Sequence, residues 1–184
     1  MDVEGELVFS FDGYLSVVSI DKQGEKDLAR FKHNGASIVD IIAENEDRIC
    51  FIEVKNPFRT SGDENVQIRM DNEQVKFFDG LRAVNAFSID IMRKFEHALF
   101  VWIASGRPAD KPIAFILYID KFETELLSQE RLKFIDHFNK YIPNIKHNPL
   151  FVESATASVS FDMPTAAEAG KRYGFTVTPP PALP

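Results

Sequence analysis

The sequence predicts an α/β (α+β) fold: one domain with a mixed central β-sheet flanked by helices. Two observations predict it. Apolar runs of strand length, rich in Val, Ile and Phe, recur along the chain. Two longer stretches, about residues 65–97 and 124–142, instead carry apolar side chains at three- and four-residue steps, which indicates amphipathic helices. Strands interleaved with such helices form a sheet on which the helices pack.

The length of the chain bounds the domain organisation. The 184 residues suit a single domain with a sizeable core, which we expect over residues 1–178. Residues 179–184 form a proline-rich tail that we expect to be disordered.

The first strands are predicted to form an N-terminal β-hairpin. Residues 7–11 and 14–20 are apolar, β-rich runs joined by Asp12 and Gly13, and Asp-Gly between such runs is a strong hairpin signal. Residues 27–33 fit either a short helix or a third strand, and we favour the strand.

A second hairpin is predicted from the apolar runs 37–43 and 49–55, which flank an acidic stretch. If the hairpin folds symmetrically about that stretch, Asp40 lies directly opposite Glu53. Opposed residues of an antiparallel pair have Cβ atoms roughly 4.5–5.5 Å apart. A shift of one residue in the register would move the two carboxylates to opposite faces of the sheet.

The remaining elements follow from the same patterns. The helical stretch 65–97 precedes two apolar runs, 98–104 and 112–119, which we interpret as central strands. The second helix, 124–142, is followed by a strand over residues 150–161.

Charge and composition exclude some classes of protein. The net charge of −7 is not that of a protein that holds nucleic acid by bulk positive charge, so any such contact must be local, helped by a cation or shared with another subunit.

Cys50 is the only cysteine, which fits a reducing compartment. The acidic start lacks the features of a signal peptide, and the apolar runs are too short to span a bilayer. We therefore expect a cytoplasmic protein that does not enter a membrane.

Three charged residues stand inside the second predicted hairpin. Asp40 lies in one apolar run, and Glu53 and Lys55 lie in the other. Buried charges need partners, and residues two apart in a strand share a face. Two opposed carboxylates repel each other, but together they can hold a hard divalent cation such as Mg²⁺. A metal that polarises a phosphate and activates water, next to a lysine, is a set of groups suited to cleaving phosphodiesters.

The same residues have a simpler interpretation. Glu53 and Lys55 could form an ordinary ion pair on one face of a sheet edge, with Asp40 facing solvent. A fold that keeps these residues for binding or assembly, without cleavage, is a second possibility. A phosphodiesterase acting on a small nucleotide is a third.

The pattern of Asp40, a dozen intervening residues and then Glu53-Val54-Lys55 resembles the PD-(D/E)XK nuclease superfamily. The resemblance covers about residues 37–104, as hairpin, long helix and next strand. It implies a restriction-endonuclease-like core, here with an added N-terminal β-hairpin. It also implies that Asp40, Glu53 and the backbone carbonyl of Val54 bind the metal and that Lys55 is catalytic. The metal is expected to be Mg²⁺, for which Mn²⁺ can substitute.

The resemblance further implies a hydrolase acting on nucleic acid, with DNA favoured, in restriction, repair or anti-phage defence. The acidic charge of the chain then suggests a homodimer or a protein partner that supplies positive charge.

Accessory residues are less well defined. The family core usually opens with a helix carrying another acid, for which Glu25 is a candidate. Some exonuclease-like members carry Gln and an aromatic residue four positions later; Gln74 and Phe78 resemble this pair, although tyrosine would match better.

Four basic residues could contact phosphates, which would position nucleic acid without reading its sequence; each alone is more simply a solvated charge. They are Arg59, Arg69, Lys76 and Arg82.

Overall fold

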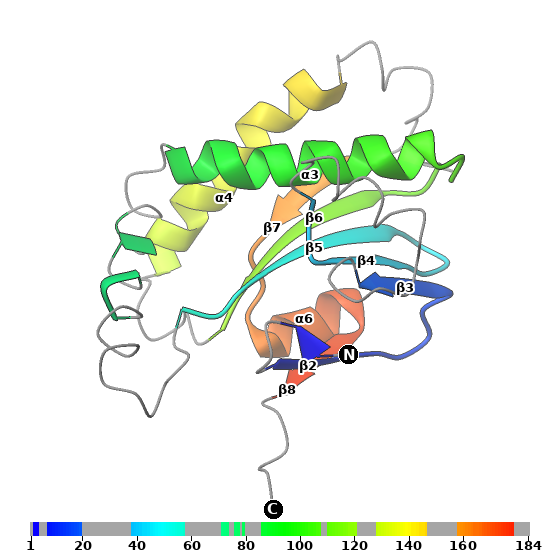
Figure 1. Ribbon diagram of the computed structural model, residues 1–184, viewed down its shortest axis with the longest axis horizontal. Coiled ribbons are helices and arrows are strands. Elements are labelled where there is room, and N and C mark those ends of the chain that lie inside the picture. Colours follow the sequence, from blue (N-terminus) through cyan, green and yellow to red (C-terminus); the bar gives the residue numbers. More distant parts are fainter. Residues whose placement is uncertain are drawn as a thin grey trace, which may run out of the picture.

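The computed structural model describes residues 2–3, 7–19, 38–57, 71–73, 76–77, 79, 86–107, 110–120, 128–146 and 158–178. Its elements are stacked in layers (Figure 1). Helices α3 (Ala86–Ala104) and α4 (Ser128–Lys146) cover one face of a five-stranded mixed sheet. Helix α6 (Ala166–Tyr173) and a small three-stranded sheet pack on the other face. The predicted class, α+β with a mixed sheet flanked by helices, is confirmed.

The larger sheet has the strand order β3-β4-β5-β6-β7. Its first three strands pair antiparallel, and its last three pair parallel. Parallel neighbours need a crossover connection, and α3 and α4 lie in these two connections. The strands are β3 (Ser16–Ser19), β4 (Ile41–Glu44), β5 (Ile49–Lys55), β6 (Ile113–Ile119) and β7 (Val159–Asp162). The small antiparallel sheet contains β1 (Asp2–Val3), β2 (Leu7–Phe11) and β8 (Phe175–Thr178), in the order β1-β2-β8.

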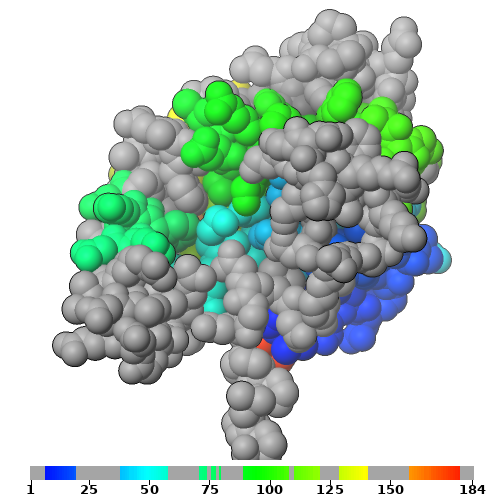
Figure 2. All heavy atoms as spheres, viewed as in Figure 1, coloured from blue at the N-terminus to red at the C-terminus, as the bar shows by residue number. Residues whose placement is uncertain are grey.

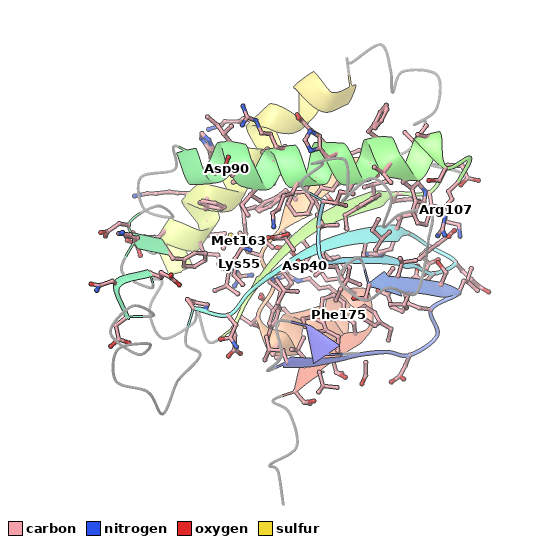
Figure 3. All side chains as sticks on the ribbon, in the orientation of Figure 1. Asp40, Lys55, Asp90, Arg107, Met163 and Phe175 are labelled. Atoms are coloured by element: carbon pink, nitrogen blue, oxygen red, sulfur yellow. The ribbon has the colours of Figure 1, made fainter. Side chains whose placement is uncertain are left out.

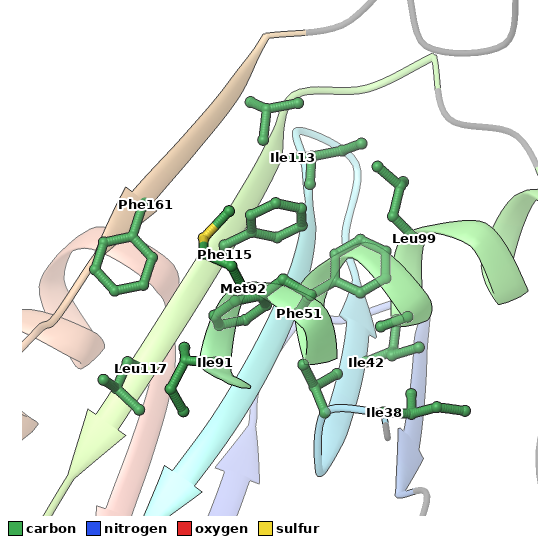
Figure 4. Packing of buried hydrophobic residues seen from close by; sticks show 14 of the residues in the cluster. Ile38, Ile42, Phe51, Ile91, Met92, Leu99, Ile113, Phe115, Leu117 and Phe161 are labelled. Atoms are coloured by element: carbon green, nitrogen blue, oxygen red, sulfur yellow. The ribbon is translucent and has the colours of Figure 1, made fainter. Parts of the chain in front are cut away.

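The core is split by the large sheet into two apolar layers, and strand alternation decides which residue enters which layer. In β5, Ile49 and Phe51 pack toward α3, whereas Cys50, Ile52 and Val54 pack toward α6 and the small sheet. Figure 4 shows the helix-side layer around Phe51. Strand β6 is buried along its whole length, as expected for a strand covered on both faces. No described helix is long and apolar enough to cross a membrane.

The predicted N-terminal hairpin is wrong. Gly13 does lie in a turn with φ of 75°, but the strands on its two sides enter different sheets: β2 pairs with β1 and β8, and β3 pairs with β4. Phe9 and Phe11 pack on Phe175, which belongs to the last strand of the chain. The Asp-Gly signal describes only the local turn, and long-range packing decides the pairing of the flanking strands.

The predicted strand over residues 98–104 is also wrong, because these residues are the second half of α3. Ala98, Leu99, Val101 and Trp102 are all buried there. Phe100, on the outer side of the helix, is apolar although it is exposed, so the run is as continuous as that of a central strand and periodicity cannot separate the two. The next strand after the long helix is therefore β6.

Other predictions are confirmed in part. Strand β3 and the run 112–119 appear where expected, and the second helix is found a few residues later than predicted. Of the strand predicted over 150–161, residues 159–161 lie in β7, and residues 150–157 lie outside the described residues. Residues 27–33 and the tail 179–184 also lie outside them. Helix α6 and strand β8 were not predicted.

Helix α6 provides a stability prediction. The Thr165 side chain accepts a hydrogen bond from the Glu168 N–H, and the Glu168 carboxylate accepts one from the Thr165 N–H, a capping box. We expect Thr165→Ala to lower the free energy of unfolding by about 1 kcal/mol in urea titrations. Thr176→Ala, at an exposed position of β8, is the control and should change it less. Equal losses in both variants would contradict the capping role.

Candidate active site

Glu53 and Lys55 lie at the carboxyl end of β5, on the face of the large sheet that α3 covers. Alternation along the strand puts them there, since Phe51 on the same face packs under α3. Glu53 is fully buried at 0% exposure, whereas the Lys55 side chain keeps 26% of its surface accessible. The strand thus holds a carboxylate inside the protein and an ammonium at the rim.

The predicted register of the second hairpin is confirmed. Ile41 pairs with Ile52 and Ala43 pairs with Cys50, so one further step places Asp40 opposite Glu53. Asp40 lies immediately before β4, and its Oδ2 accepts a 2.7 Å hydrogen bond from the Val54 N–H. The N–H and C=O of one strand residue point to the same edge, so the Val54 carbonyl faces the Asp40 side as well. Figure 3 shows Asp40 and Lys55 on the sheet beneath α3.

The two carboxylates influence each other. The pKa of Asp40 is raised to about 6, first by burial and second by the negative charge of Glu53. The Val54 N–H and the lysine ammonium groups oppose this rise. Asp40, Glu53 and Lys55 therefore share one electrostatic environment, as the sequence predicted.

A second lysine completes the cluster. Lys94 of α3 places its Nζ 2.5 Å from Oε1 of Glu53, and the Nζ of Lys55 lies 2.6 Å from the same oxygen. Lys94 was not among the site residues predicted from the sequence. A signal was present, because Lys94 follows buried Ile91 by three residues and precedes buried Ala98 by four. A lysine on the buried stripe of a helix needs a partner in the layer beneath it.

The other carboxylate oxygen of Glu53 indicates what the cluster can bind. Within the described residues, Oε2 is buried and has no hydrogen-bond partner. A buried, unsatisfied carboxylate oxygen is costly, and a hard cation is a partner that it accepts. Mg²⁺ is typically held by one or two carboxylates and keeps its other positions for water and substrate phosphate. Asp40, Glu53 and the Val54 carbonyl fit that donor set.

The other predicted site residues lie elsewhere. Lys76 is exposed in a helical segment, residues 76–77. The remaining candidates lie outside the described residues, so the structure does not bear on them: Glu25, Arg59, Arg69, Gln74 and Arg82. No cluster of three or more His, Cys, Asp or Glu side chains suited to a metal occurs among the described residues. The described part of the chain therefore brings two carboxylates, Asp40 and Glu53, to this site.

Solvent reaches the rim of the cluster. Lys55 and Lys94 expose 26% and 23% of their side chains. In Figure 2, atoms of the segment 38–57 are visible at the surface below α3. Solvent therefore reaches both lysine side chains, while Glu53 stays buried.

Fold and site together define an α+β protein with two carboxylates and two lysines gathered between its main sheet and a crossover helix. Comparison of the chain with protein-family models, with curated proteins and with solved structures found no match.

Proposed function

We propose that the protein is a metal-dependent nuclease of the PD-(D/E)XK type, a hydrolase that cleaves phosphodiester bonds of nucleic acid. The observation that carries the proposal is the convergence of Asp40, Glu53 and Lys55 at one end of the β4–β5 hairpin. The proposal includes DNA as the favoured substrate, a cytoplasmic location and a role in restriction, repair or anti-phage defence.

The order of elements supports a restriction-endonuclease-like core. Hairpin β4–β5 is followed by the long helix α3 and then by β6, which pairs parallel with β5. Hairpin, long helix and next strand are the parts that the resemblance implies. In this proposal the core runs from about residue 38 to residue 119, and β6 takes the place assigned to residues 98–104.

Each residue has a role that its position supports. Asp40, Glu53 and the Val54 carbonyl would hold Mg²⁺, or Mn²⁺ in its place. Such an ion supplies Lewis-acid polarisation of the phosphate and a bound water of lowered pKa. The Val54 N–H fixes the Asp40 carboxylate, and the paired strands keep it opposite Glu53. Lys55, at the rim, orients the attacking water or stabilises the negative charge that develops on the phosphate.

The charge of the chain shapes the substrate proposal. At −7 the protein as a whole repels nucleic acid, so its grip must come from the local cluster and from a second subunit. We propose a homodimer or a complex with a basic protein. Lys76 is exposed and available for a phosphate contact within this scheme.

One observation favours a second candidate function. Glu53 is already paired with two lysines and Asp40 adds a second negative charge, so the described side chains of the cluster form an ion-pair network without any added ion. Such a network could stabilise a binding or assembly subunit that does not cleave.

A cleavage assay tests the proposal. Single- and double-stranded DNA and RNA are incubated with the protein and Mg²⁺ or Mn²⁺, with EDTA as control. We expect metal-dependent cleavage, with duplex DNA the best substrate. If the folded protein cleaves none of the four with either metal, the second candidate function is favoured, and capture of a partner is the next step.

A further inference from the structure

The described side chains of the candidate active site include equal numbers of positive and negative groups. Two carboxylates, Asp40 and Glu53, face two ammonium groups, Lys55 and Lys94, and both ammonium groups contact the same oxygen, Oε1 of Glu53. With all four groups ionised the charges cancel. A neutral site has little attraction for a phosphodiester, so the lysines cannot serve as phosphate ligands while they are held by Glu53.

We propose that a divalent cation displaces Lys55 and Lys94 from Glu53 and thereby delivers both ammonium groups to the phosphate of the substrate. This inference rests on the proposed function and specifies how the site is regulated. The two lysines act as exchangeable counter-ions of Glu53. Metal and substrate then bind cooperatively, because the bound metal frees the two ammonium groups that bind the substrate phosphate.

The geometry supports the exchange. Oε2 of Glu53 has no hydrogen-bond partner in the described part of the chain, so a cation can bind this oxygen before either lysine leaves Oε1. The lysine side chains are long and flexible, and both are partly exposed at the rim. They can turn outward without repacking the core, whereas Glu53 is fixed at 0% exposure.

The exchange changes the charge of the site. With a divalent cation added, the summed charge of the four side chains and the ion is +2. This positive charge attracts phosphate at a partly buried site. An acidic protein then binds nucleic acid only when it is loaded with metal. Lys94 supplies half of the released ammonium charge from α3, and the resemblance assigns this lysine no role.

The first test measures metal affinity, without any cleavage. Free Mn²⁺ is quantified by its EPR signal in titrations of the wild type and of Lys94→Gln. We expect Lys94→Gln to bind Mn²⁺ about tenfold more tightly, because a competing cation has been removed from Glu53. Lys94→Arg keeps the charge and should stay near the wild-type affinity.

Lys111→Gln is the matched control. Lys111 is equally exposed at 23% and makes a similar ion pair, 2.7 Å to Oε1 of Glu44, at the opposite end of β4. Its loss should leave Mn²⁺ affinity unchanged. If Lys94→Gln binds Mn²⁺ with unchanged or lower affinity, the displacement proposal is wrong and Lys94 only supports the site.

The second test measures duplex DNA binding in Ca²⁺ and in EDTA at several salt concentrations. We expect wild-type affinity to rise with the cation. In Ca²⁺, Lys94→Gln should make the slope of log affinity against log salt shallower by about one, the effect of one lost phosphate contact. In EDTA the wild type and the variant should have the same slope. Equal slopes of the wild type and Lys94→Gln in Ca²⁺ would contradict the proposal that Lys94 contacts the phosphate.

Failure of the inference is distinguishable from failure of the proposed function. Asp40→Asn should abolish the Mn²⁺ binding seen in the wild type. If it does so while Lys94→Gln shows no gain, the metal site stands and the exchange does not. If Asp40→Asn binds Mn²⁺ like the wild type, both proposals fail.

Discussion

Asp40→Asn is expected to reduce metal-dependent cleavage at least about a thousandfold, because it removes a proposed metal ligand, one of the two carboxylates that the described residues place at this site. Lys55→Met should reduce it about a hundredfold to a thousandfold, through the loss of one group that stabilises developing charge. The rates are compared on the best substrate of the wild type under single-turnover conditions. Asn at position 40 can still accept the Val54 N–H, so the loss would reflect chemistry rather than unfolding.

Each variant has a matched control. Asp47→Asn makes the same change in the exposed turn between β4 and β5, and Lys111→Met removes a lysine of similar exposure. Both controls should cleave like the wild type. Wild-type rates for Asp40→Asn or Lys55→Met would show that these residues do not form the active centre.

Asp40→Asn should also have a large effect on stability. Although it lowers the cleavage rate, it should raise the free energy of unfolding of the metal-free protein. The pKa of Asp40 is raised from 3.8 to about 6 on folding. Well below pH 3.8 the Asp40 carboxyl is protonated in both states and has no effect on their balance. As the pH rises from about 4 to 6, the unfolded chain loses this proton first, so the free energy of unfolding falls. Above pH 6 the full penalty, about 3 kcal/mol, is present.

The measurement is urea unfolding of the wild type and of Asp40→Asn in EDTA between pH 4 and pH 8. The stability difference should grow with pH over the interval from about 4 to 6 and then level off in favour of the variant. Comparing the two proteins at each pH cancels the other titrating groups. A difference that does not change with pH would contradict the burial of an ionisable Asp40 beside Glu53.

Glu53→Gln, in contrast to Asp40→Asn, should destabilise the protein. Glu53 is the shared partner of two lysines, so its loss leaves two ammonium groups beside a neutral amide. We expect this variant to be about 2–3 kcal/mol less stable than the wild type at neutral pH. Opposite changes in the free energy of unfolding of these two variants would show that ionised Asp40 destabilises the fold, whereas the ion pairs of Glu53 with the two lysines stabilise it.

The register of the β4–β5 hairpin was predictable from the sequence, since two apolar runs flank a short polar turn and leave little choice of pairing. That register and the two-residue period together place Asp40, Glu53 and Lys55 on one face. These are local features, which a sequence records directly.

Other features depend on contacts between distant segments. Lys94 meets Glu53 only because α3 crosses over the sheet between two parallel strands. The pairing of β2 with β8 joins the two ends of the chain, and nothing near β2 encodes it. The strand prediction for residues 98–104 is wrong because apolar residues stand on both the buried and the exposed side of this part of α3, which gives a run as continuous as that of a buried strand.

Asp40 and Glu53 are proposed to hold a divalent metal, and a crystal structure of the protein soaked in Mn²⁺ provides the sharpest test. We expect an anomalous scattering peak between the two carboxylates, about 2 Å from an oxygen of each and from the Val54 carbonyl, with Lys94 turned away from Glu53. A peak elsewhere, or none at saturating Mn²⁺ with both lysines still on Glu53, would contradict it.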